Sequence, residues 1–287
     1  MSDNLKFSTL GRILIYLVIL LICSLIGVAF TFLMLLAGDT GLLLGQGISS
    51  ILIFIVPPIV YYYVTRKQNP VAALGLRSVN RPWGFYILIG VVLMFASLPA
   101  TNQLTEWNEG MSFGPAFAKL EEYLKTMEEA AAEVTERMLN VDTVGGLLLN
   151  LFVIALIPAI GEELTFRGLL QQSLTRSMKN PHVAIILTGA IFSFIHFQFY
   201  GFLPRMFLGI LLGYMFYISG SLWTSMAMHF VNNGTAVVVY YLNHKGIIDV
   251  DVDHFGAMSL GMVALSTAVT VALIVWSWHT SQKRKGL

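Results

Sequence analysis

The chain has 287 residues, of which 56% are hydrophobic and only 11% are charged. A soluble domain carries about 25% charged residues, so this composition indicates a polytopic membrane protein whose surface contacts lipid. The formal net charge of +1 gives no indication of nucleic-acid binding, and no basic run is long enough to suggest it. The single cysteine, Cys23, excludes an intrachain disulfide.

The predicted elements are helices throughout. A helix needs about 20 apolar residues to cross a bilayer, and the sequence predicts eight such spans, at 13–37, 42–64, 85–104, 144–164, 183–200, 206–219, 222–242 and 258–278. The first is longer than the roughly 7–15 apolar residues of a signal peptide, so we expect it to be retained. The fold class is therefore all-α, a membrane helix bundle of about eight transmembrane helices.

One long polar stretch, 106–142, separates the third span from the fourth. Within it Phe117, Leu120, Tyr123, Leu124 and Met127 recur at helical spacing among Glu and Lys residues. This pattern predicts one or two amphipathic helices that lie on the membrane surface or cap the bundle. A solvated loop with helical propensity is the alternative.

The distribution of Lys and Arg predicts the orientation of the chain. With the N-terminus inside, 12 of the 17 positive charges fall in inner segments, as the positive-inside rule requires. We therefore expect an integral membrane protein with both termini cytoplasmic.

Ionisable residues interrupt the apolar segments of the second half of the chain. Such residues are costly at membrane depth and usually face a bundle interior where they have a function. They form three patterns: Glu162-Glu163-x-x-x-Arg167, Phe192-x-x-x-His196 and His229-x-x-x-Asn233.

Residue counts place these patterns at a similar depth. Glu163 lies 16 residues before Lys179 and His196 lies 15 residues after Pro181, which at about 1.5 Å per residue puts both roughly 23 Å above one turn. His229 lies 8 residues past the turn at Ser221. Convergence requires one long helix over 144–178, kinked near Pro158; a helix ending near 164 would instead leave the glutamates far from His196.

Roles follow from spacing. Glu163 and Arg167 are separated by one helical turn and form a predicted structural ion pair. Glu162 projects about 100° away and is the expected general base. His196 is expected to orient the attacking water, while His229 and Asn233 donate to the oxyanion. Asn232 points elsewhere.

These residues resemble those of the CAAX prenyl protease and bacteriocin-processing (CPBP) family of intramembrane endopeptidases. The three patterns are all present, with Phe166-Arg167-Gly168 and Gly220-Ser221-Leu222-Trp223 around them, over about a third of the chain. The resemblance implies cleavage of a peptide bond near the membrane, with Glu162 and His196 activating water and His229 and Asn233 holding the oxyanion. We divide the chain into N-terminal helices with the amphipathic segment (1–142), a CPBP-type catalytic core (143–243), and a last helix with a basic cytoplasmic tail (244–287).

Several alternatives stay open. We favour metal-free catalysis without a cofactor; Glu162, His196 and His229 are the zinc ligands of the alternative, with Glu163 as base. A peptide-binding or immunity protein without catalysis is a second alternative, and a proton-coupled transporter a third. The expected partners are the lipid bilayer and a peptide or membrane-protein substrate.

Overall fold

The computed structural model describes residues 8–66, 69–76, 83–250 and 259–285, and all regular secondary structure in these ranges is helical. Six of these helices are long and apolar enough to cross a membrane: Leu10–Leu35, Gly38–Arg66, Gly84–Glu109, Val144–Met178, Phe202–Ser219 and Leu260–Gln282. Two more helices, α10 (Pro181–Phe194) and α12 (Leu222–His244), occupy the fifth and seventh predicted spans. The predicted all-α bundle is confirmed.

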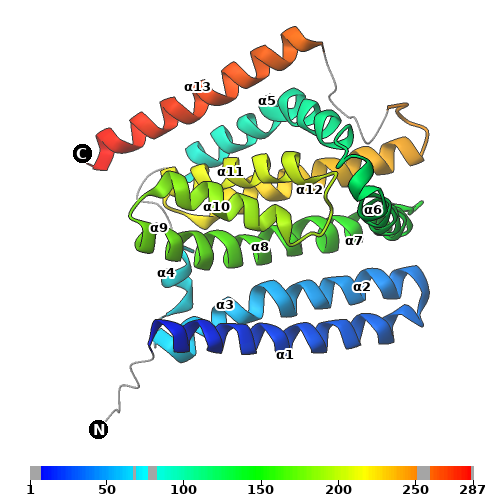
Figure 1. Ribbon diagram of the computed structural model, residues 1–287, viewed down its shortest axis with the longest axis horizontal. Coiled ribbons are helices and arrows are strands. Elements are labelled where there is room, and N and C mark those ends of the chain that lie inside the picture. The colour runs from blue at the N-terminus through cyan, green and yellow to red at the C-terminus, as the bar shows by residue number, and fades with distance from the viewer. Residues whose placement is uncertain (1–7, 67–68, 77–82, 251–258, 286–287) are drawn as a thin grey trace.

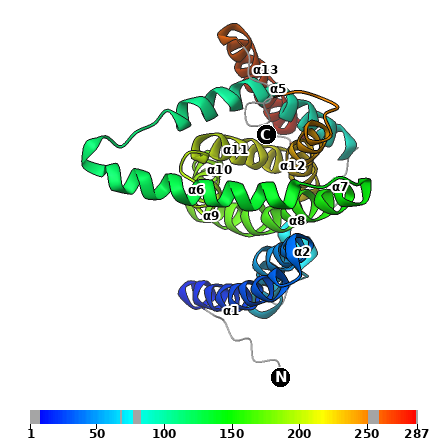
Figure 2. The ribbon, with the colours of Figure 1, turned by 90° about the vertical axis from the view of Figure 1, so that its right-hand side faces the viewer.

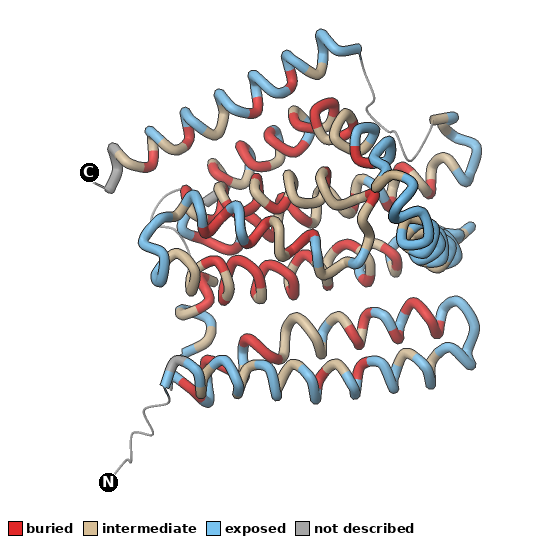
Figure 3. The backbone as a smooth tube through the Cα atoms, viewed as in Figure 1, coloured by how far each residue is buried: buried red, intermediate tan, exposed pale blue. Residues whose placement is uncertain are grey.

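The helices form a central bundle flanked by two outer layers (Figure 1). One layer contains α1 (Thr9–Leu35), α2 (Gly38–Ser50) and α3 (Val56–Tyr61), and the other contains α5 (Trp83–Glu109) and α13 (Leu260–Lys285). Buried residues concentrate in the central helices, whereas α1 and α13 are exposed along most of their length (Figure 3). Because the exposed side chains of α1 and α13 are mainly apolar, these helices suit contact with lipid.

The bundle has two distinct ends. The start of α1 and the end of α13 lie at one end, beside α4 (Pro70–Leu74), which we call the α4 end (Figure 1). Helix α6 (Ala118–Leu139) runs across the opposite end, which we call the α6 end (Figure 2). It is the predicted amphipathic element, a single helix with no buried residue, and Arg137 near its end pairs with Asp39 of α2 at 2.7 Å.

The predicted long fourth helix is present from Val144 to Met178. It consists of α7 (Val144–Asn150), α8 (Ile157–Glu163) and α9 (Gln172–Met178), joined by widened π-helical segments at Leu151–Leu156 and Leu164–Gln171. Pro158, which has no backbone N–H to donate, directly follows the start of α8, and π-type turns are a common way to absorb such a break. The alternative in which the helix ends near 164 is wrong.

The turn after α9 is formed as predicted. Lys179 adopts a left-handed conformation with φ 55°, and the Asn180 side chain accepts hydrogen bonds from the N–H groups of His182 and Val183. The second predicted turn contains Gly220 with φ 70°, which ends α11 (Phe202–Ser219).

Two predicted boundaries need correction. The fifth span was expected to reach residue 200, but α10 ends at Phe194 and the sixth begins at Phe202. Phe197 in the connection has φ 53°, a left-handed conformation that a helix cannot continue through. The predicted start of the last span, at 258, and residues 1–7 of the polar N-terminus lie outside the described residues.

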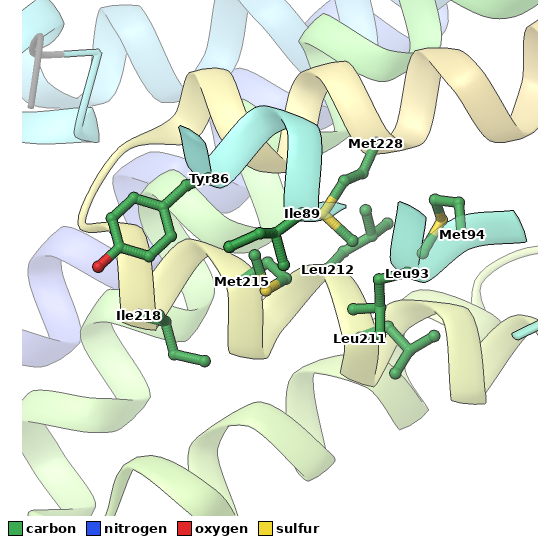
Figure 4. Packing of buried hydrophobic residues seen from close by; sticks show 9 residues of the cluster. All are labelled: Tyr86, Ile89, Leu93, Met94, Leu211, Leu212, Met215, Ile218 and Met228. Carbon is green, nitrogen blue, oxygen red and sulfur yellow. The ribbon is translucent and has the colours of Figure 1, made fainter. Parts of the chain in front are cut away.

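A hydrophobic cluster holds α5, α11 and α12 together (Figure 4). Leu93 of α5, Met215 of α11 and Met228 of α12 are fully buried in it. A Cβ atom at Gly90 would lie 2.5 Å from Met228 Cγ, so the absence of a side chain at position 90 makes room for Met228 between α5 and α12. The cluster positions α11 and α12, which carry much of the candidate site.

Candidate active site

A cavity of about 330 Å³ lies among α5, α8, α10, α11 and α12. It extends from the start of α11 at the α6 end to Glu162, about midway along the long fourth helix, and to His229 in the first half of α12. Seven polar side chains line it together with apolar residues: Thr105, Glu162, His196, Arg205, His229, Asn232 and Asn233. The three sequence patterns therefore meet in one cavity.

The predicted ion pair between Glu163 and Arg167 is present and fully buried. Arg167 Nη1 donates to Glu163 Oε1 at 2.7 Å, and both side chains have 0% exposure. Arg167 Nη2 donates to the backbone carbonyl of Gly209 at 2.8 Å, and the guanidinium lies 4.9 Å above the Phe192 ring. Arg167 thus joins the long fourth helix to α10 and α11.

Glycine residues allow the close packing on which this link depends. A Cβ atom at Gly209 would lie 3.1 Å from Gly189 Cα, so α10 and α11 approach almost backbone to backbone. One turn further along, Gln171 Nε2 donates to the carbonyl of Gly213 at 2.9 Å. Two side chains one turn apart on the fourth helix therefore bind two carbonyls one turn apart on α11.

His229 contacts both glutamates through different ring atoms. Its Nδ1 lies 3.0 Å from Glu163 Oε1, and its Nε2 lies 3.8 Å from Glu162 Oε2. Glu162 and Glu163 diverge around the axis of their helix, but an imidazole placed between the two carboxylates reaches both.

His196 is oriented by its own helix. Its Nδ1 lies 2.8 Å from the carbonyl oxygen of Phe192, and since a carbonyl only accepts, Nδ1 carries the proton of that bond. In the neutral ring this leaves Nε2 as an acceptor. The Phe192 ring packs edge-on between the two histidines, 5.2 Å from His196 and 6.0 Å from His229.

The amide pair on α12 differs from the prediction. Asn232 was expected to point elsewhere, but both Asn232 and Asn233 line the cavity. Asn232 Nδ2 donates to Asn233 Oδ1 at 3.1 Å, so the two amides are oriented by each other. Neighbours on a helix can face one cavity when it is wide enough to span the 100° between them.

Two polar residues at or beside the cavity belong to none of the three sequence patterns. Arg205, one of the five positive charges outside the predicted inner segments, lines the cavity. Asn108 of α5, 1% exposed, donates to the carbonyl of Phe199 at 2.9 Å and accepts from the Leu203 N–H at 2.6 Å. It therefore holds the connection between α10 and α11 that carries His196. A positive charge in the first turn of a helix, against the helix dipole, was the available signal for Arg205.

The side chains present do not fit a metal ion well. No three His, Cys, Asp or Glu side chains in the described part of the chain converge closely enough to hold one. Both His229 nitrogens face carboxylates, and His196 Nδ1 faces a carbonyl, which leaves few lone pairs directed at a common point.

The fold and the cavity define a polytopic membrane protein with a polar site inside its helix bundle. A family model described as type II CAAX prenyl endopeptidase Rce1-like matches residues 144–235, from α7 into α12. This segment, about a third of the chain, is similar to that family of CAAX-type endopeptidases, and the similarity indicates a protease. The six long apolar helices indicate an integral membrane protein. No curated protein and no solved structure matches the chain.

Proposed function

We propose that the protein is an intramembrane endopeptidase that cleaves a membrane-associated peptide or protein by direct attack of water. The observation that carries the proposal is the single cavity that brings together Glu162, His196, His229 and Asn233. In this proposal Glu162 is the general base, and Glu163 and Arg167 are structural.

The activation of water requires two acceptors. A carboxylate oxygen of Glu162 accepts a proton from the water while the oxygen of that water attacks the carbonyl carbon of the scissile bond. His196 Nε2, the remaining acceptor of the neutral ring, accepts the second hydrogen bond and orients the water. When the tetrahedral intermediate collapses, the C–N bond breaks and Glu162 returns the proton to the leaving amine.

The oxyanion of the tetrahedral intermediate needs hydrogen-bond donors. Asn233 Oδ1 is engaged by Asn232, so the amide Nδ2 of Asn233 is the group that donates. His229 donates through Nε2–H, which requires the doubly protonated ring because Nδ1–H already donates to Glu163. The two carboxylates, Glu163 and the ionised Glu162, then balance the two positive charges of Arg167 and His229, which keeps these groups tolerable in an apolar interior.

Orientation follows from charge. Arg66 and Arg176 lie on helical segments that end at the α4 end, and Lys179 directly follows α9 there. The positive-inside rule places that end in the cytoplasm. Under this assignment both termini are cytoplasmic and the cavity opens toward the outer face.

Peptide cleavage by purified protein in nanodiscs tests the proposal. A proteome-derived peptide mixture would be incubated with each variant, and new termini identified by mass spectrometry. Glu162→Gln, His196→Ala and Asn233→Ala should each lower cleavage by about 100-fold or more while leaving protein abundance unchanged.

Matched controls separate chemistry from general damage. His182→Ala changes a histidine at the start of α10, where its Nδ1 lies 2.9 Å from the Tyr214 hydroxyl, and should leave cleavage intact. Cleavage that persists in Glu162→Gln would refute the catalytic assignment. Loss of cleavage on chelation, restored by stoichiometric zinc, would favour the zinc-dependent alternative.

A further inference from the structure

Arg205 places a positive charge in the cavity wall that the proposed hydrolysis does not use. It lies in the first turn of α11, near the α6 end of the cavity, and is half-buried. A cation at the start of a helix opposes the helix dipole, so this position lowers stability rather than raising it. The cost suggests a functional reason for the charge.

The guanidinium is held in a defined place. Arg205 Nη2 donates to Gln198 Oε1 at 2.7 Å, and Nη1 lies 3.5 Å from the Gln198 carbonyl oxygen. The side chain folds back over Gly201, where an added Cβ atom would lie 2.8 Å from Nη2 and 3.3 Å from Nη1. The absence of a side chain at Gly201 therefore makes room for the guanidinium.

Arg205 forms no ion pair within 4.0 Å of any acidic side chain in the described parts of the chain. Glu162 lines the same cavity but lies beyond that distance, and Glu128 of α6 accepts from the Tyr200 N–H at 2.9 Å. Its contacts with Gln198 use at most two of the five N–H groups of a guanidinium. The remaining N–H groups of the guanidinium are suited to bidentate binding of a carboxylate.

We propose that Arg205 binds a carboxylate of the peptide substrate and so determines which bond lies at Glu162 and His196. The carboxylate is either the C-terminal group of the peptide or an Asp or Glu side chain. This inference rests on the proposed protease function, and it adds a specificity-determining residue to it.

Three short probes distinguish the sources of the carboxylate: N-acetyl-trileucine, its C-terminal amide, and N-acetyl-Leu-Glu-Leu amide. Their binding would be measured by calorimetry with the Glu162→Gln protein in nanodiscs. A charged hydrogen-bonded contact predicts that at least one carboxylate probe binds about 10- to 100-fold more tightly than the neutral amide. Arg205→Gln in the same background should remove that preference.

Gly201→Ala provides a matched test because it keeps the charge and displaces the guanidinium. We expect it to lose most of the preference as well, whereas Arg176→Gln, an exposed arginine near the α4 end, should retain it. The peptide mixture adds a second readout: cleavage sites of the wild-type protein should lie at a fixed distance from a carboxylate, and Arg205→Gln should lose this pattern.

The outcomes separate the two hypotheses. Equal binding of acid and amide probes, or binding of none, overturns the role of Arg205. Cleavage without a carboxylate pattern overturns it as well but leaves the protease intact. A carboxylate preference that depends on Arg205, with no cleavage of any peptide, supports the binding site and counts against the protease.

Discussion

Replacing Glu163 by glutamine removes the charge that Arg167 and His229 share. Glu163 Oε1 lies 2.7 Å from Arg167 Nη1 and 3.0 Å from His229 Nδ1. Arg167 has 0% exposure, so no water can replace the lost carboxylate. Glu163→Gln should therefore destabilise the folded protein, and Glu162→Gln should not.

The magnitude follows from the burial of the pair. Removing one partner of a buried ion pair costs about 3–5 kcal/mol, because it leaves the other charge uncompensated. Glutamine keeps one acceptor oxygen, which favours the lower end of that range. By the scaling for domains of about 150–250 residues, this loss lowers the Tm by on the order of 10 °C. Glu162 lies 3.8 Å from His229, too far for a strong hydrogen bond, so its replacement should cost less than about 1 kcal/mol.

Thermal unfolding of the purified variants in one detergent measures the difference. The double variant Glu163→Gln/Arg167→Met should recover part of the loss, because it removes the stranded charge together with its partner. If Glu163→Gln and Glu162→Gln lower the Tm equally, the assignment of Glu163 to structure is refuted. If Glu163→Gln keeps its stability and abolishes cleavage, the roles of the two glutamates are exchanged.

Two further predictions concern the α10–α11 connection and the orientation of the chain. Asn108→Ala removes two hydrogen bonds to Phe199 and Leu203, at a cost of about 1–3 kcal/mol; limited proteolysis should then cut within residues 195–201, and unchanged protection would contradict this. In a Cys23→Ser background, Thr126→Cys on α6 should react with an impermeant maleimide on intact cells. Ser177→Cys near the α4 end should react only after permeabilisation; the reverse pattern would overturn the orientation.

Local patterns in the sequence predicted much of the fold. Pro181 and Gly220 marked the turns that bring the fourth, fifth, sixth and seventh helices together, because a proline starts a helix and a glycine ends one at low cost. Counting residues from the first turn predicted that the glutamate pair and His196 lie at a similar depth, and Glu162 and His196 do line one cavity. The spacing of Glu163 and Arg167 correctly predicted their ion pair.

Other features depend on packing between helices that are distant in sequence. Asn108 forms hydrogen bonds with Phe199 and Leu203, which are 91 and 95 positions away in the sequence. No local periodicity could therefore indicate the role of Asn108. The sequence indicated Arg205 only as a positive charge of an outer segment, because its place in the cavity wall depends on how the connection folds after Phe197 and on the space at Gly201. The placement of His229 between two glutamates depends on the rotation of α12 about its axis, which the cluster around Met228 determines.

The sequence by itself determined the helical class of this membrane protein, its turns and the depth of its costly polar residues. These properties follow from composition and from a constant rise per residue, both of which act along a single helix. Only the tertiary structure decided which side chains share the cavity and which groups each one contacts. Those contacts depend on helix rotation and on close approaches such as that of Gly189 and Gly209, which involve atoms from separate helices.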